Sequence, residues 1–162
     1  MFLWRTSSFN PCKIWLKTNS CNLSITSTTS CSCIKNCIIA YCFADVQGYS
    51  KFGSYDGNST GNDNNFQYCG FSPAWVMIKC DSAAESWVIF DTKRNGFNPD
   101  NDELYADLTG AETSTEAVDF LSNGFNPYKG TGTVNRSGKS YIFMAFAEHP
   151  FVTSTGVPAT AK

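Results

Sequence analysis

The sequence is poor in charged residues and contains no long hydrophobic run. Charged residues make up 16% of the 162 residues and the formal net charge is −2, so we expect no electrostatic attraction to nucleic acid. No stretch approaches the roughly 20 apolar residues that a membrane span requires. Residues 1–20 also lack a compact apolar segment followed by a small-residue cleavage site, which predicts that no secretory signal is present.

The sequence has a single histidine, which limits the enzymes it could form. A Ser-His-Asp triad needs a base, and His149 lies between Glu148 and Pro150 at the end of a predicted strand, without any G-x-S-x-G motif. A glycan-degrading enzyme would need two carboxylates about 5–10 Å apart. The acids at predicted strand ends more often cap turns or form ion pairs. We therefore predict that the chain is not an enzyme and has no catalytic residues, with a glycan-degrading domain as the least favoured alternative. The carboxylates considered for it are Asp45, Asp91, Asp119 and Glu148.

Acidic residues are absent before Asp45, and six of the eight cysteines precede residue 43. We therefore divide the chain into residues 1–37 and residues 38–162. A metal site built from Cys31, Cys33, Cys37 and Cys42 would lack the paired spacing of zinc modules and a nearby histidine. A disulfide framework is disfavoured because no export signal is predicted. The interpretation we favour is a poorly specified segment, a truncated or out-of-frame remnant of a preceding repeat.

From residue 38 onward, apolar runs alternate with clusters of turn-forming residues. Aromatic residues make up 15% of the chain, which suits the pleated faces of β-sheets. The pattern predicts an all-β fold, an antiparallel β-sandwich or jelly roll, in which residues 73–80 and 86–91 form a hairpin of the central sheet. A helix over residues 107–120 within an α+β domain is the alternative. The other predicted strands are 38–46, 49–55, 66–71, 117–121 and 140–148.

Flat aromatic side chains are the candidate ligand-binding residues of this domain. Six aromatic residues could stack on sugar rings, and the alternative for the two tryptophans is that they fill the core. They are Tyr49, Tyr68 and the four that we favour, Trp75, Trp87, Tyr55 and Tyr105.

A run of oxygen-bearing side chains is the candidate metal site. Asn98, Asp100 and Asp102 could hold calcium, although such a run is more often a solvated turn. No other cofactor is expected. Cys69 and Cys80 lie within apolar segments, as Cys42 does, which predicts small buried side chains rather than nucleophiles.

Five blocks of the sequence resemble a known family in their order and spacing. They are AYCFADVQGYSKFGSYDGN, GFSPAWVMIK, SWVIFDTKR, DFLSNGF and YIFMAFAEHPF. Together they resemble a domain of unknown function that recurs in predicted virion and tail-fibre proteins of tailed phages, particularly marine ones, over about residues 38–162. The resemblance implies a β-rich structural or host-recognition module without established catalytic residues.

The resemblance also implies a location and partners. We expect a module of the phage particle, made in the cytoplasm of the host bacterium. Its expected partners are other phage structural proteins, further copies of itself in a homotrimer, and a bacterial surface glycan. The alternative is a carbohydrate-binding, receptor-binding module. A binding module should gather exposed aromatic and Asx residues at one loop end. An architectural module should bury Trp75 and Trp87 and expose a lateral apolar patch.

Overall fold

The computed structural model describes residues 2–6, 12–17, 40–58, 65–94, 97–99, 102–114, 117–129 and 132–150. These residues form strands, turns and loops, and none of the described residues lies in a helix. They therefore include no helix that could cross a membrane. The chain divides into two units, Met1–Ala44 and Asp45–Lys162, and each is described by itself.

The first unit contains a three-stranded antiparallel sheet. Its strands β1 (Phe2–Thr6), β2 (Cys12–Lys17) and β3 (Ala40–Ala44) pair in the order β1-β2-β3. Two of these strands fall within residues 1–37, where the sequence shows no sustained pattern. The third begins two residues after the start of the strand predicted at 38–46.

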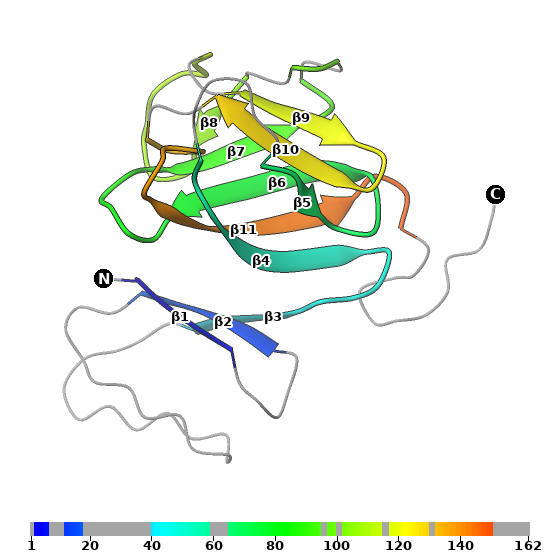
Figure 1. Ribbon diagram of the computed structural model, residues 1–162, viewed down its shortest axis with the longest axis horizontal. Helices are drawn as coiled ribbons and strands as arrows, with labels where there is room; N and C mark the ends of the chain where they lie inside the picture. The colour runs from blue at the N-terminus through cyan, green and yellow to red at the C-terminus, as the bar shows by residue number, and fades with distance from the viewer. Residues whose placement is uncertain are drawn as a thin grey trace. The chain divides into compact units, whose positions relative to one another are not determined.

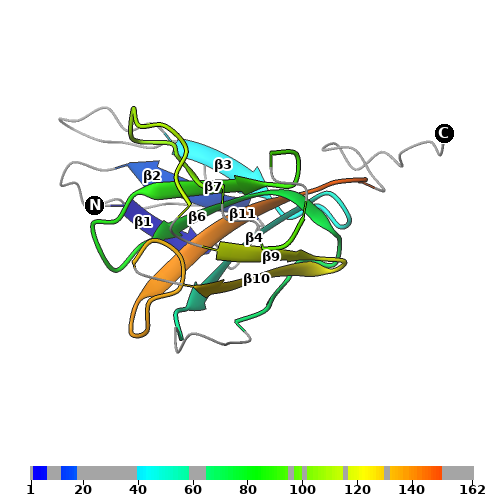
Figure 2. The same cartoon turned by 90° about the horizontal axis from the view of Figure 1, so that it is seen from above.

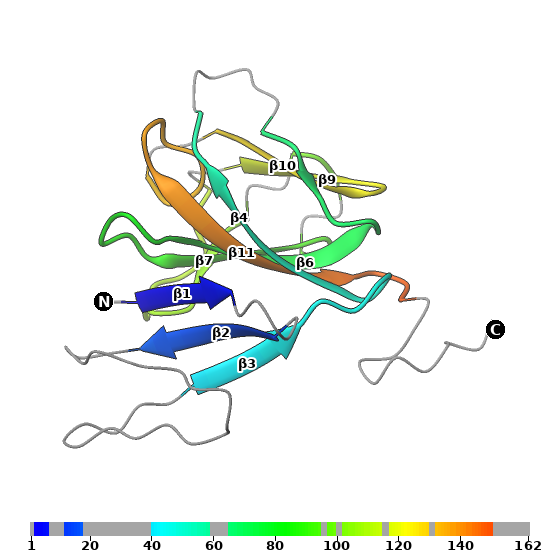
Figure 3. The same ribbon diagram turned by 60° about the horizontal axis from the view of Figure 1, so that its bottom comes forward.

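The second unit is built on a five-stranded antiparallel sheet. Its strands are paired in the order β4-β11-β6-β7-β8, so that β11 lies in the interior of the sheet between β4 and β6 (Figure 3). The hairpin predicted from two apolar runs is confirmed, because β6 pairs with β7. The strand bounds are β4 (Ser50–Asp56), β6 (Pro73–Cys80), β7 (Trp87–Asp91), β8 (Leu104–Tyr105) and β11 (Ser140–Ala147).

A smaller antiparallel sheet forms the second layer of this unit. Its strands β5 (Gln67–Tyr68), β9 (Ala117–Leu121) and β10 (Gly124–Lys129) pair in the order β5-β10-β9. Figures 1 and 2 show β9 and β10 as a separate layer beside the five-stranded sheet. The predicted all-β sandwich is thus confirmed, and the described residues of 107–120 contain strand and loop rather than the alternative helix.

Alternation along the strands decides which side chains form the core. In β6 the side chains of Val76, Ile78 and Cys80 are buried against the small sheet, while the residues between them point to the opposite face. From the small sheet, Val118 and Phe125 contribute to the same core. The two inner faces therefore bury one shared apolar layer, as a sandwich requires.

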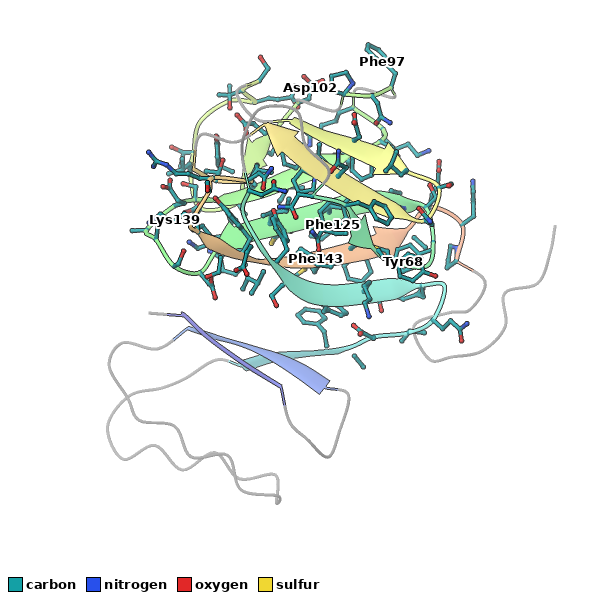
Figure 4. The ribbon with its side chains drawn as sticks, in the orientation of Figure 1. Tyr68, Phe97, Asp102, Phe125, Lys139 and Phe143 are labelled. Carbon is teal, nitrogen blue, oxygen red and sulfur yellow. The ribbon has the colours of Figure 1, made fainter. Side chains whose placement is uncertain are left out.

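The two sheets meet at the centre of this core through Phe143 of β11 and Phe125 of β10 (Figure 4). Their rings pack edge to face, with centroids 5.0 Å apart and planes at 78°. Gly53, the register partner of Phe143 on β4, leaves the space for this ring. A Cβ atom at Gly53 would lie 2.5 Å from Cε1 of Phe143, so a side chain there would push the ring from its place.

A pair of stacked tyrosines closes one end of the core. The rings of Tyr55 and Tyr141 lie 5.1 Å apart at 14°. The hydroxyl of Tyr55 donates to the carbonyl oxygen of Val134 at 2.5 Å, and that of Tyr141 donates to the carbonyl of Gly132 at 2.7 Å. These two bonds hold the segment that leads into β11, because its backbone would otherwise have buried carbonyls without donors.

We expect Gly53→Ala to destabilise the second unit. The added methyl group must displace the ring of Phe143, and overpacking of this kind typically costs about 1–3 kcal/mol of unfolding free energy. Urea denaturation followed by tryptophan fluorescence measures the change.

The matched control is Gly110→Ala. Gly110 is exposed and has no heavy atom within 4 Å of the position that its Cβ would take, so this variant should stay within about 0.5 kcal/mol of the wild type. Equal unfolding free energies for the two variants would contradict the role assigned to Gly53.

Candidate functional site

The outer face of the five-stranded sheet, which points away from the small sheet, is lined with apolar side chains. Directly paired residues of antiparallel strands project to the same face, and Met77, Ile89 and Leu104 follow one another in register across β6, β7 and β8. A sheet face in contact with water is usually polar. We call the half-buried apolar residues of these three strands the lateral band: Trp75, Met77, Trp87, Ile89 and Leu104.

The apolar surface continues from the lateral band toward the edge of the sheet. Met144 of β11 pairs with Met77 on one side and with Phe52 of β4 on the other. Phe52, Ile142 and Met144 on this face are only 1%, 4% and 8% exposed. The outer face is thus apolar across all five strands of this sheet. Phe52, Ile142 and Met144 are themselves shielded from water, and the half-buried residues of the lateral band are the more accessible part of this face.

An aromatic cluster forms one end of this face. Phe146 of β11 is in contact with three other rings, those of Tyr49, Phe52 and Trp75, at centroid distances of 6.0, 5.9 and 5.6 Å. The first two contacts are edge to face and the third is tilted. Packing of this kind fixes the orientation of Trp75, so its half-buried indole presents a rigid surface.

A network of ion pairs lies beside this aromatic end. Asp91 is the register partner of Trp75, and its carboxylate accepts a hydrogen bond from Nε of Arg94 at 2.6 Å. Arg94 also donates to Glu112 and to the carbonyl oxygen of Ile89. Burial alone would raise the pKa of Asp91, but the hydrogen bonds from Arg94 and from backbone amides outweigh it and hold that pKa below its ordinary value.

A second ion pair extends the same charged margin. Nζ of Lys93 lies 3.0 Å from Oε1 of Glu148, and this hydrogen bond lowers the pKa of the Glu148 carboxyl. Lys93 is exposed and Glu148 is partly exposed, so water screens the pair and it adds little stability. Its contribution is a margin that carries both signs of charge next to the lateral band.

A buried lysine marks the other end of the face. Lys79 is only 5% exposed, and its ammonium donates to the carbonyl oxygens of Cys80 at 2.8 Å and Glu85 at 2.6 Å. Cys80 is the last residue of β6, and Glu85 lies in the turn between β6 and β7. A buried ammonium requires such partners. Lys79 therefore fixes the turn beside Trp87, and its ammonium already donates hydrogen bonds within the domain.

The four aromatic residues predicted to bind a ligand do not share one surface. Trp75 and Trp87 both lie in the lateral band, but four residues of register separate them along the strands, about 13 Å. Tyr105 pairs with the core residue Val88 and therefore faces inward. Tyr55 is 8% exposed and lies in the core, where its hydroxyl holds Val134.

The three predicted calcium ligands are only partly described. Asp100 lies outside the described residues, and Asp102 is half-buried. The Asn98 side chain is engaged with the edge of β9: its Nδ2 donates to the carbonyl of Phe120 at 2.8 Å, and its Oδ1 accepts from the amide of Phe120 at 2.9 Å. No group of three or more His, Cys, Asp or Glu residues in the described part of the chain is arranged to hold a metal ion.

The two cysteines of the sandwich are buried and unpaired, as their sequence context predicts. Burial raises the pKa of the Cys69 thiol to about 12, so it stays protonated and unreactive at neutral pH. The side chains of Cys42 and of the other cysteines considered for a metal site, Cys31, Cys33 and Cys37, lie outside the description.

The aliphatic members of the lateral band were not among the predicted site residues. The signal for them is present in the segments AWVMI and WVIF, which are apolar at successive positions instead of alternating. A strand with this composition is buried on both faces. The residues of an outer contact face could therefore be inferred from such runs, once the inner face is assigned.

Comparison with known proteins gives one family. A family model described as "Domain of unknown function (DUF7483)" matches residues 5–150. The match begins closer to the N-terminus than the resemblance over about residues 38–162 and includes both units. Neither the search of curated proteins nor that of solved structures gives a match.

The lowered pKa of Asp91 predicts how stability depends on pH. Because the folded-state pKa lies below the ordinary value of 3.8, the stabilisation is present above that value and is lost as the pH falls through the folded-state pKa. The urea midpoint should therefore fall as the pH is lowered from 7 to 3, and Arg94→Gln should reduce this dependence.

Arg136→Gln removes the same charge from an exposed residue and should leave the pH dependence close to that of the wild type. If the two variants lose the same amount of pH dependence, the effect comes from net charge and not from the pair of Arg94 with Asp91.

Proposed function

The chain belongs to the DUF7483 family of domains of unknown function, and from this premise we propose that it is a non-catalytic structural module of a tailed-phage virion, part of a tail fibre. The proposal rests on two kinds of support. Five sequence blocks resemble a domain that recurs in predicted virion and tail-fibre proteins. The second unit also carries a lateral apolar face, in which Trp75 and Trp87 are half-buried and do not belong to the core.

The observation that carries the proposal is the lateral band. Trp75, Met77, Trp87, Ile89 and Leu104 are half-buried side chains on adjoining strands, and a continuous apolar surface of this kind marks a contact with another protein. Tryptophan is also among the residues enriched where proteins bind one another. We propose that this band packs against further copies of the same chain in a trimer.

The charged margin fits the same role. Lys93 and Arg94 lie on it together with Asp91, Glu112 and Glu148, so the margin carries both signs of charge. In a symmetric contact between identical chains, the same surface must complement its own copy or its neighbour. A mixed margin around an apolar centre satisfies this requirement, with the exposed charges fixing the register more than the affinity.

The ion pairs formed by acidic side chains support a role without catalysis. Asp45, Asp91 and Glu148, three of the four carboxylates considered for a glycan-degrading enzyme, form ion pairs with Lys51, Arg94 and Lys93. Pairing of this kind fixes turns and strand ends. A carbohydrate site centred on the four predicted aromatic residues is less favoured, since Tyr55 lies in the core and Tyr105 faces inward.

Light scattering on the full chain tests the assembly. The wild type should have about three times the 17.8 kDa mass of one chain. Glutamates at the central cross-strand pair, Met77→Glu with Ile89→Glu, should shift the mass to that of the monomer because they place charge in the centre of the apolar contact.

The control Phe97→Glu changes an exposed aromatic residue that belongs to a loop outside the lateral band and should keep the trimer. Near-ultraviolet circular dichroism shows whether each variant retains its packed core. A monomeric wild type, or a folded Met77→Glu, Ile89→Glu variant with an unchanged mass, would overturn assembly through the lateral band.

A further inference from the structure

The outer face of the small sheet is unlike the lateral band, because it carries exposed aromatic side chains. Among the described residues, the exposed large hydrophobic side chains are Phe66, Tyr68, Phe97, Leu108 and Leu121. Three of these five belong to one surface. Gly124 of β10 pairs with Tyr68 on one side and Leu121 on the other, and Phe66 directly precedes β5. Tyr68 is 64% exposed, so its ring is available to a ligand.

A glycine allows one of these rings to lie across the sheet. A Cβ atom at Gly124 would lie 2.9 Å from Cε2 and Cζ of Phe66 and 2.1 Å from the carbonyl oxygen of Gln67. The Phe66 ring therefore rests directly over the backbone of Gly124, in the place of a side chain. As a result, Phe66 and Tyr68 lie on one face of the small sheet, where Gly124 of the central strand presents no side chain. We call Phe66, Tyr68, Gly124 and Leu121 the platform.

Two polar side chains stand next to the platform on the same face. Asn126 and Asp119 are register partners on β10 and β9, and each is two residues from a platform residue along its strand, a distance of about 7 Å. The neighbours Phe125 and Val118 point inward to the core. Alternation therefore places both polar groups outward, beside the aromatic rings.

The polar pair offers both a hydrogen-bond donor and an acceptor. Oδ1 of Asn126 accepts from the backbone amide of Asn65 at 2.9 Å, which leaves its Nδ2 as the outward donor. The Asp119 carboxylate has no hydrogen-bond or ion-pair partner among the described residues. It is also partly desolvated, which raises its pKa. An unpaired carboxylate inside a strand gains from a ligand that donates hydrogen bonds to it.

We propose that the platform, with Asp119 and Asn126, binds a saccharide. The apolar face of a pyranose ring would stack on Tyr68 and Phe66. Its hydroxyl groups, each of which both donates and accepts, would bond with the carboxylate of Asp119 and the amide of Asn126. A cation such as a lysine side chain would use the acceptor but not the donor, so the paired chemistry favours the sugar.

This site is independent of the lateral band. It lies on the other sheet of the sandwich and on its opposite outer face, so a chain assembled through the five-stranded sheet would keep the platform accessible. It also agrees with the expectation of a bacterial surface glycan through Tyr68, one of the six aromatic residues considered for sugar stacking, and without the four that we favoured.

Titration of the ¹⁵N-labelled full chain tests the proposal, because the amide shifts locate the contact. The probes are maltohexaose, chitohexaose and oligosaccharides released from bacterial lipopolysaccharide. At least one should shift the amides of residues 67–69 and 124–126 in a saturable way. Tyr68→Ala should abolish the shifts, and Asp119→Asn should weaken binding about tenfold, or about 1.4 kcal/mol.

The control is Phe97→Ala, which removes an aromatic residue that is 72% exposed and lies on a loop away from Tyr68 (Figure 4). It should bind as the wild type does. Tyr68→Ala should keep both the wild-type urea midpoint and the wild-type mass, which separates this site from the trimer contact. Failure of all three probes, shifts that persist in Tyr68→Ala, or saturation by oligolysine in place of the saccharides would each overturn the proposal.

Discussion

The contact between Phe143 and Phe125 is the interaction on which the rest of the second unit depends. It joins the interior strand of the large sheet to the middle strand of the small one, and it exists because Gly53 leaves the space that the Phe143 ring fills. Once this contact fixes the distance between the sheets, alternation along each strand decides which side chains turn outward. The same alternation therefore defines both surfaces. The lateral band consists of side chains of the large sheet that face away from the core, and the platform of those of the small sheet.

The two outer faces have different chemistry. The large sheet carries half-buried tryptophan and aliphatic side chains on its outer face, which suits contact with protein. The charged margin lies at one end of this face, and the turn held by Lys79 lies at the other. The small sheet combines two exposed rings with one carboxylate and one amide, which suits a small ligand with hydroxyl groups. On the proposals made above, one module could be held in an assembly by one face and present the other to its surroundings. This division follows from a sandwich whose two sheets differ in size and composition.

Much of the fold could be predicted from the sequence, and less of the sites. The apolar runs of β6 and β7 indicate their hairpin because β-strands of this composition and spacing pair locally, and the bounds of β9 agree with the apolar run at 117–121. The location of Tyr55 in the core could not be inferred, because it depends on stacking with Tyr141, 86 positions later in the chain. In the same way, the local sequence offers Asn98 as a candidate calcium ligand or as part of a solvated turn, and its bonds with Phe120 depend on a pairing that the local sequence does not contain. The platform depends on the register of three strands, which turn-forming residues alone do not fix.

Short polar side chains and one pair of backbone hydrogen bonds satisfy backbone groups at the edge strands of both sheets. Oδ1 of Asp45 accepts from the amide of Phe52 on β4, Val46 exchanges two backbone hydrogen bonds with Ser50, and Asn98 takes both backbone groups of Phe120 on β9. A strand from another molecule could not pair at these positions without first displacing them. Neighbouring molecules at high local concentration, as in a fibre, would thus be unable to merge their sheets into a continuous amyloid-like ribbon there. Molecules would then associate only through contacts between their side-chain surfaces. Because such surfaces must be complementary, they limit how many chains can join.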